Sequence, residues 1–186
     1  PTVRIFASGN LDEYKIEKMV KANAPIDDFG VGTNMGTSCD APFLDVIYKI
    51  SEVTDATGRF LPTMKFSHRK VSYPGRKQVY RFQEGGVFKN DIIALEEESI
   101  KGGRPLLAQV IKKGKRIHAS STLPEIHRRA RYNISHLPKQ CRQLSTHFKY
   151  SVLISEGLQK TVHRLSQALK QRSEKASEAA SSAQVA

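Results

Sequence analysis

The stretch VRIFASGNLDEYKIEKMVKANAPIDDFGVGTNMGTSCDAP, residues 3–42, decides the expected fold. It opens with an apolar run at 3–6 that breaks at Ser8-Gly9-Asn10, and an amphipathic helical pattern follows. A second apolar run at 29–31 breaks at Gly32-Thr33. This order predicts an α/β unit of strand, turn, helix, strand and turn. Because a helical crossover joins parallel strands, both turns should lie at one edge of a sheet, where α/β folds bind ligands.

The composition of the two turns favours a phosphate ligand. Glycine lets backbone N–H groups approach a phosphate closely, and Ser, Thr and Asn add polar side chains. Ordinary βα turns use the same residue types, so either turn alone is better explained as a plain turn. Two equivalent turns on neighbouring strands favour the phosphate-binding interpretation. The candidate phosphate-binding residues are Ser8, Gly9, Asn10, Gly32 and Thr33.

Charge and cysteine content limit the possible binding partners and the expected cellular compartment. The 186 residues carry a net charge of +12, and the basic excess lies after residue 60. Such a surface suits nucleic acid, an acidic membrane or phosphorylated small molecules, although charge runs are often only a solvated face. Cys39 and Cys141 lack the spacing of a metal or disulfide site, and no apolar run reaches the ~20 residues of a membrane span. We therefore expect a cytoplasmic protein without membrane association or metal ligands of its own.

After residue 43 the pattern changes to short strands separated by glycine turns. Turn signals about every ten residues indicate a largely antiparallel, β-rich module at 44–118. A basic run from Lys65 to Lys77 suits phosphates, but a plain basic turn fixed by Pro74-Gly75 explains it better. The expected strands are 44–53, 63–67, 77–83, 88–95 and 106–112.

Helices are marked by capping residues. Asn10 is a candidate cap of the first helix, with Glu13 three residues later, and Thr122 has the same relation to Glu125. The carboxyl-terminal region 119–172 is expected to hold helices at 121–136 and 155–172, and the Ala- and Ser-rich tail 173–186 is expected to be disordered.

Four motifs carry a resemblance to a known family. They are FASGNLDEYKI at 6–16, FGVGTNMGTSCDAP at 29–42, VIYK at 46–49 and PGRKQVYR at 74–81. In this order and spacing, they resemble successive landmarks of nicotinate phosphoribosyltransferase, and the similarity extends over residues 3–158. Ser72 occupies a position where the family commonly has threonine, a departure that keeps the hydroxyl.

The resemblance implies a fold and a size. Residues 1–43 would be the last βα units of a type II phosphoribosyltransferase α/β barrel, followed by the β-rich module and the carboxyl-terminal helices. A closed barrel of eight strands usually needs about 250 residues. We therefore expect this chain to be the carboxyl-terminal portion of a longer enzyme, with the remaining part upstream.

The resemblance also implies an activity. The family forms nicotinate mononucleotide and pyrophosphate from nicotinate and phosphoribosyl pyrophosphate, in NAD salvage, with ATP and Mg²⁺ as cofactors and a homodimer as its assembly. The five turn residues would bind the 5′-phosphate, whereas the catalytic residues would lie upstream, so this segment alone is expected to be inactive. The alternative is a basic module that binds nucleic acid or protein without enzymatic activity. That alternative needs aromatic residues among the cations, and only a weak version of this pattern occurs, around residues 73–82.

Overall fold

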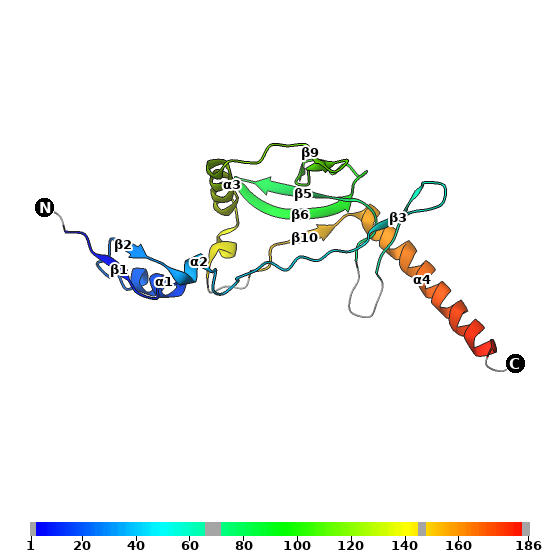
Figure 1. Ribbon diagram of the computed structural model, residues 1–186, viewed down its shortest axis with the longest axis horizontal. Coiled ribbons are helices and arrows are strands. Elements are labelled where there is room, and N and C mark those ends of the chain that lie inside the picture. Colours follow the sequence, from blue (N-terminus) through cyan, green and yellow to red (C-terminus); the bar gives the residue numbers. More distant parts are fainter. Residues whose placement is uncertain (1–2, 66–71, 145–147, 184–186) are drawn as a thin grey trace. The chain divides into compact units, whose positions relative to one another are not determined.

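The computed structural model describes residues 3–65, 72–144 and 148–183, with side chains up to residue 173. The chain divides into two units, one formed by residues 1–48 and 143–146 and the other by residues 49–142 and 147–186. Figure 1 shows the helices and strands of the two units. The predicted basic run falls partly on residues 66–71, which lie outside the described residues.

The first unit contains the α/β motif that the sequence predicts. Strands β1 and β2 pair in parallel, with Phe6 opposite Asp28 and Ser8 opposite Gly30. The helix α1 connects them, and the short α2 follows β2 (Figure 1, blue). The first strand lies later than the apolar run at 3–6, because its pairing with β2 extends through Ser8. The elements are β1 (Phe6–Ser8), α1 (Glu13–Lys21), β2 (Asp28–Gly30) and α2 (Thr33–Gly36).

The cap of α1 is Asp12, so the prediction of Asn10 as the capping residue is wrong. The Asp12 carboxylate accepts a hydrogen bond of 2.8 Å from the Lys15 backbone N–H. Asp12 has the extended backbone that a cap requires, whereas Asn10 has a φ of 49° in the left-handed region. Asn10 therefore belongs to the turn and not to the helix.

The strand predicted at 44–53 is wrong over most of its length. Regular pairing begins only at β3 (Glu52–Thr54), which runs antiparallel to β4 (Phe60–Pro62). Between residues 44 and 50 the apolar side chains are exposed, with Leu44 at 89% and Tyr48 at 93%. An alternating segment needs a neighbouring strand for its backbone hydrogen bonds, and the described residues supply none here. The strand predicted at 63–67 is also wrong where it is described, over 63–65.

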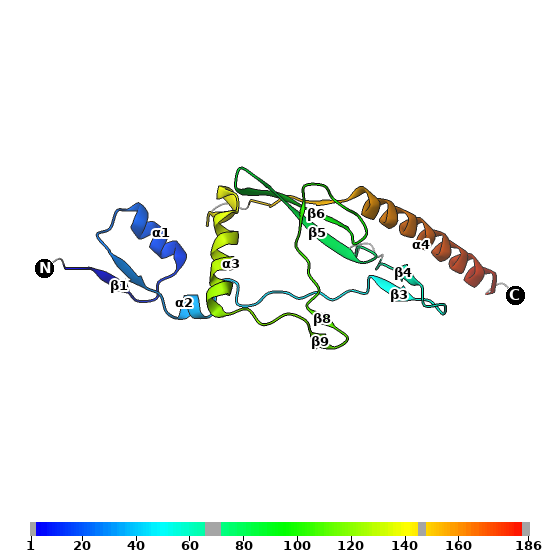
Figure 2. The ribbon, with the colours of Figure 1, turned by 90° about the horizontal axis from the view of Figure 1, so that it is seen from above.

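The second unit is built on a mixed four-stranded sheet, in the order β10-β6-β5-β7 (Figures 1 and 2). The antiparallel hairpin of β5 and β6 confirms the strands predicted at 77–83 and 88–95. Gly85 and Gly86 form its turn with positive φ angles of 55° and 79°. The edge strand β10 pairs in parallel with β6 and was not predicted. The strands are β5 (Lys77–Glu84), β6 (Val87–Leu95), β7 (Arg104–Pro105) and β10 (Val152–Ile154).

The single strand predicted at 106–112 is wrong. Its beginning follows β7, where the Leu106 N–H donates to the Val79 carbonyl at 2.8 Å. Its end is β8 (Ile111–Lys112), which folds back on β9 (Lys115–Arg116) instead of continuing along the main sheet. The cause is the turn between them, where Lys113 and Gly114 have φ angles of 49° and 73°.

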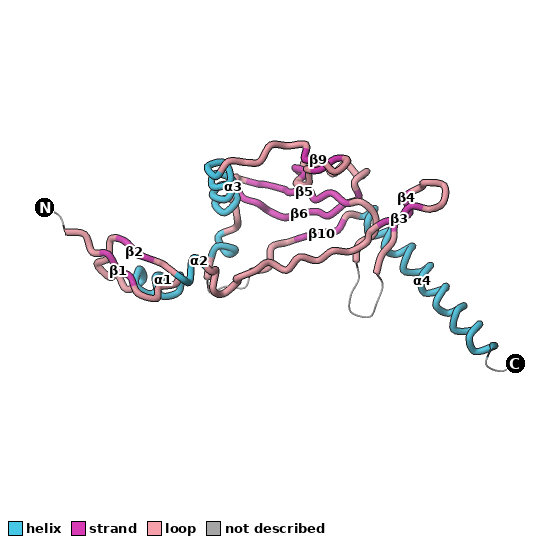
Figure 3. The backbone as a smooth tube through the Cα atoms, in the orientation of Figure 1, coloured by secondary structure: helices cyan, strands magenta, loops and turns pink. Residues whose placement is uncertain are grey.

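Two long helices complete the second unit (Figure 3, cyan). The helix α3 (Leu123–Ser135) begins with the predicted capping box, in which Thr122 and Glu125 satisfy each other's backbone N–H groups. A short 3₁₀ helix, η1 (Lys139–Arg142), follows it. The helix α4 (Glu156–Ala183) buries Leu158 completely and continues past the predicted end at residue 172. The alanines of the predicted disordered tail have high helix propensity, which explains this continuation.

Candidate functional site

The two turns of the first unit enclose one hollow of about 490 Å³. All five candidate residues line it, so the structure brings together every residue that the sequence singled out. Four further lining residues were not among the candidates, although each lies within two positions of one of them. The lining consists of Ser8, Gly9, Asn10 and Leu11 from the first turn and Gly30, Val31, Gly32, Thr33 and Asn34 from the second. A phosphate-binding role for this hollow stays a prediction.

The first turn has an unusual backbone. Gly9 and Asn10 have consecutive positive φ angles of 111° and 49°. Glycine adopts this region freely, and asparagine is among the few other residues that tolerate it. Leu11 follows with only 5% of its surface exposed and anchors the turn. The turn therefore combines a left-handed backbone beside the hollow with a buried side chain that follows it.

The second turn approaches the hollow through glycine. A Cβ on Gly30 would lie 2.8 Å from two ring carbons of Phe6, so a side chain at this strand end would require the exposed Phe6 ring to shift. A Cβ on Gly32 would meet no protein atom within 4 Å, so the space beside this residue is open. Thr33 begins α2, and the first N–H groups of a helix have no partner within it. These N–H groups and the Thr33 hydroxyl are suitable donors for an anionic oxygen.

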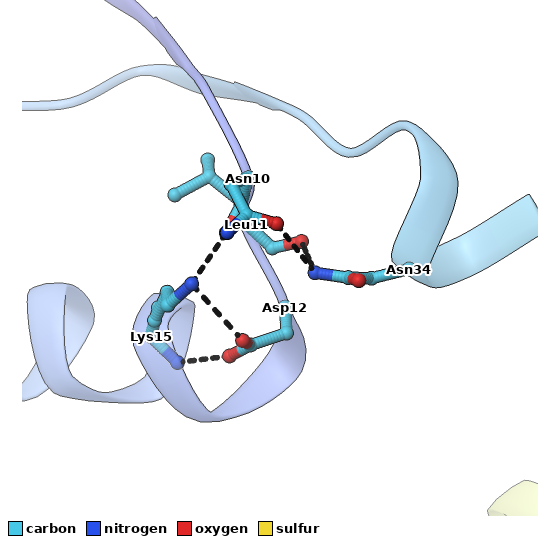
Figure 4. A network of polar contacts seen from close by, with 5 residues as sticks. All are labelled: Asn10, Leu11, Asp12, Lys15 and Asn34. Atoms are coloured by element: carbon cyan, nitrogen blue, oxygen red, sulfur yellow. Dashed lines mark hydrogen bonds and ion pairs between the residues drawn. The ribbon is translucent and has the colours of Figure 1, made fainter. Parts of the chain in front are cut away.

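No charged side chain lines the hollow among the residues that the structure describes. A charged pair lies beside the first turn, where Lys15 Nζ is 3.4 Å from an Asp12 carboxylate oxygen (Figure 4). The same ammonium donates to the Asn10 carbonyl at 2.6 Å. The backbone N–H of Lys15, bonded to the Asp12 carboxylate, lowers the pKa of Asp12. An anion in the hollow would thus be held by backbone and neutral polar donors of this unit.

Asn34 connects the two turns. Its side-chain nitrogen donates to the Leu11 carbonyl at 2.9 Å and to the Asn10 side-chain oxygen at 3.4 Å (Figure 4). The signal that could have identified Asn34 is its position directly after Thr33, in the second turn. Without the fold, nothing in the sequence pairs Asn34 with a residue 23 or 24 positions earlier.

Two arginines of the basic region, Arg76 and Arg81, are engaged within the second unit. Arg76 forms an ion pair of 2.6 Å with Glu52 and lies 4.3 Å from the centre of the Phe60 ring. Arg81 pairs with Asp91 at 2.8 Å. Cations and aromatic rings already in contact with each other offer a poor surface for stacking bases. These contacts favour the structural interpretation of the basic region.

Neither a metal centre nor a membrane span is found in the described ranges. Over residues 3–65, 72–144 and 148–183, no group of three or more His, Cys, Asp and Glu side chains could hold a metal ion. In the same ranges, no helix is both long enough and apolar enough to cross a membrane.

Comparison with known proteins identifies the family. Residues 102–162 match the family model of the nicotinate phosphoribosyltransferase C-terminal domain. Nicotinate phosphoribosyltransferase pncB2 of Mycobacterium tuberculosis is 42% identical over 165 residues, which are 88% of this chain and 34% of that protein. The chain belongs to the nicotinate phosphoribosyltransferase family. The nicotinate phosphoribosyltransferase of Bacillus subtilis is 36% identical over 107 residues, which are 55% of this chain and 22% of that protein.

A solved structure of the same family shows the same fold. The crystal structure of human nicotinic acid phosphoribosyltransferase superposes with a TM-score of 0.63, at 22% sequence identity. The superposition covers 88% of this chain and 33% of the human chain. The chain thus spans about a third of the length of the Mycobacterium and human relatives. Within the described residues the strands form open sheets and no closed barrel.

Proposed function

We propose that this chain is the carboxyl-terminal part of a nicotinate phosphoribosyltransferase, and that its two turns bind the 5′-phosphate of the phosphoribosyl group. The observation that carries the proposal is the single hollow between the turns, since it unites all five candidate residues at the carboxyl ends of two parallel strands. That edge of a sheet is the usual ligand site of α/β folds. The names of the relatives supply the reaction class.

In this proposal the enzyme couples nicotinate to phosphoribosyl pyrophosphate and releases nicotinate mononucleotide and pyrophosphate. The turn residues bind and orient the phosphoribosyl group, and they transfer no proton. Fixed donors around a phosphate lower the barrier by holding the reacting groups in place. The chain alone is expected to be inactive, because the residues that act on nicotinate and pyrophosphate belong to the rest of the enzyme.

The same proposal covers the architecture of the intact enzyme, its cofactors, its assembly and its cellular compartment. The parallel pair β1–β2 would be two neighbouring strands of an α/β barrel, and the relatives, about three times as long, have room for the others. ATP and Mg²⁺ would bind to residues in the rest of the enzyme, and ATP hydrolysis there would drive the reaction. The intact enzyme would be a cytoplasmic homodimer.

Two substitutions in the intact enzyme test the phosphate assignment. Gly32→Val adds a side chain where the hollow is open and no protein atom lies within 4 Å, so it should obstruct the ligand more than it disturbs its neighbours. Each lost charge-assisted hydrogen bond is worth about 1.5–3 kcal/mol, so the KM for phosphoribosyl pyrophosphate should rise about tenfold or more. Thr33→Ser keeps the hydroxyl and serves as the control. An equal rise in both substrate constants, with the fold intact, would show that this turn does not bind the phosphate.

A further inference from the structure

We propose that Asn34 is a positioning residue that fastens the two turns to each other and thereby sets the affinity for the phosphoribosyl substrate. The inference rests on the proposed function, because it deepens the role of the same hollow. Asn34 touches the hollow from the second turn, yet both acceptors of its side-chain amide belong to the first turn. Its effect is therefore expected to act through the placement of the first turn.

The strands alone do not fix the distance between the turns. The paired register ends at Ser8 and Gly30, and both turns extend beyond it. Among the described residues, the two hydrogen bonds from Asn34 are the only ones that join residues 9–11 to residues 31–34. Donors on separate turns can grip one phosphate only when their spacing is held, so this link has a direct consequence for binding.

The chemistry of the link requires an amide. Both partners of Asn34 are oxygen acceptors, the Leu11 carbonyl and the Asn10 side-chain oxygen, so the nitrogen of the Asn34 amide must face them. That nitrogen carries two N–H groups, one for each acceptor (Figure 4). A carboxylate of the same shape has no donor, and it would also place a negative charge beside the phosphate.

A second contact restrains Asn10 from outside the hollow. The Lys15 ammonium donates to the Asn10 carbonyl at 2.6 Å, although Lys15 is not one of the lining residues. Asn10 has a φ of 49°, a conformation that is less stable for non-glycine residues and needs support from its surroundings. Asn34 and Lys15 thus hold Asn10 at its side chain and at its backbone, respectively.

The test uses steady-state kinetics of the intact enzyme that carries this chain, with each substrate varied in turn. Asn34→Ala should raise the KM for phosphoribosyl pyrophosphate about tenfold, while kcat and the KM for nicotinate change less than about twofold. Asn34→Asp should raise the KM for phosphoribosyl pyrophosphate further, since this substitution adds a negative charge. Lys15→Met should raise it about threefold. Asn23→Ala is the matched control, because Asn23 also has a positive φ of 51° in this unit but does not line the hollow.

The outcomes separate this inference from the proposed function. If the wild-type enzyme does not use phosphoribosyl pyrophosphate at all, the proposed function itself is wrong. If the wild type is active and Asn34→Ala keeps its KM for phosphoribosyl pyrophosphate, the inference is wrong while the proposed function stands. A fall in Tm with a lower kcat and an unchanged KM would show that Asn34 is merely structural, which also overturns the inference. Should Asn34→Ala fail to fold, Asn34→Asp decides alone, because it keeps the shape of the side chain and removes both donors.

Discussion

Asp91 joins three parts of the second unit through its carboxylate, and only 7% of its surface is exposed. Arg81 donates to its two oxygens at 2.9 and 2.8 Å, and the Tyr150 hydroxyl donates at 3.2 Å. The Arg81 guanidinium also lies 4.6 Å from the centre of the Phe88 ring. This cluster connects β5, β6 and the segment that leads into β10.

Removing the carboxylate should therefore destabilise the second unit. Loss of one partner from a buried pair costs about 3–5 kcal/mol, and we expect Asp91→Ala near the lower end because the Arg81 side chain remains 22% exposed. Urea denaturation should measure this as a fall in the free energy of unfolding. Glu84→Ala breaks the exposed pair with Lys89 in the same hairpin and should leave stability nearly unchanged. Equal effects of the two variants would contradict the assignment.

The capping box of α3 should give stability a dependence on pH. The Thr122 backbone N–H, and then its hydroxyl, donate to the Glu125 carboxylate and lower the pKa of Glu125 below its ordinary value of 4.5. A lowered pKa in the folded state means a stabilisation that is complete above pH 4.5 and lost as the pH falls through the folded-state pKa.

The Tm advantage of the wild type over Glu125→Gln should accordingly be present near neutral pH and disappear in acid. Thermal unfolding followed by circular dichroism between about pH 3 and pH 7 would measure it. Glutamine keeps the shape and one acceptor oxygen, so the comparison isolates the charge at the first turn of the helix. A Tm difference that does not change over this range would show that the carboxylate does not stabilise the cap.

At the scale of elements, the start of α4 is fastened to the end of β6 by one side chain. The Glu98 carboxylate accepts hydrogen bonds from the Leu95 N–H at 2.7 Å, the Ser155 hydroxyl at 2.6 Å and the Gly157 N–H at 3.2 Å. A Cβ on Gly157 would lie 2.5 Å from a Glu98 oxygen, which explains glycine at this position. The helix therefore depends on a loop residue for its orientation on the sheet.

Glu98→Ala should loosen this joint. It removes three acceptor contacts and leaves donors unpaired, so we expect a loss of about 2 kcal/mol or more in the free energy of unfolding. Hydrogen exchange should become faster in the first turns of α4, whereas β5 should change little. The neighbouring, exposed Glu97 is the matched control, because Glu97→Ala removes the same charge without the contacts to α4. Identical exchange in both variants would rule out the proposed joint.

The elements that sequence predicted correctly are those whose signals are local. The hairpin β5–β6 follows from two alternating runs around Gly85-Gly86, and α3 follows from Thr122 and Glu125. The strand β10 was missed because three apolar residues directly before a helix have no period of their own. Residues 44–50 alternate as a strand does, but a strand also needs a partner, and periodicity carries no information about one.

In the candidate site, too, the local features were predictable from the sequence and the contacts between distant residues were not. The residues of both turns could be selected, because glycine and small polar residues directly after apolar runs mark the ends of parallel strands. The link through Asn34 could not, since it depends on side-chain contacts between turns more than 20 residues apart. The cap was assigned to Asn10 instead of Asp12 because both residue types cap helices, and only the backbone angles distinguish them.

At the scale of the whole molecule, residues 43–50 expose an extended apolar surface. Val46 is 91% exposed, and Phe43 and Ile47 are both 74% exposed. Large exposed apolar segments of high β-propensity associate with other chains. We therefore expect the chain to self-associate when it is prepared alone, in a manner that depends on concentration.

Light scattering against concentration would measure this association. The double variant Val46→Lys and Tyr48→Lys should shift the midpoint of association to about tenfold higher concentration, because charges on an exposed apolar segment oppose its pairing with another chain. Glu96→Gln and Glu97→Gln together, at two exposed positions, also raise the net charge by two and serve as the control. A chain that stays monomeric at all concentrations would show that this surface does not drive association.

The parallel pairing of β10 with β6 also determines when the second unit can be completed during synthesis. Asp91 and its partner Tyr150 lie 59 positions apart, and most of the intervening chain forms other elements. On the ribosome, the β5–β6 hairpin emerges long before β10, so one edge of β6 stays open while η1 and α3 are still being made. The nascent chain thus passes through a stage in which a central strand is temporarily an edge, the form in which sheets recruit foreign strands. Slow translation of this region would prolong that stage. A chaperone would then bind the open edge of β6.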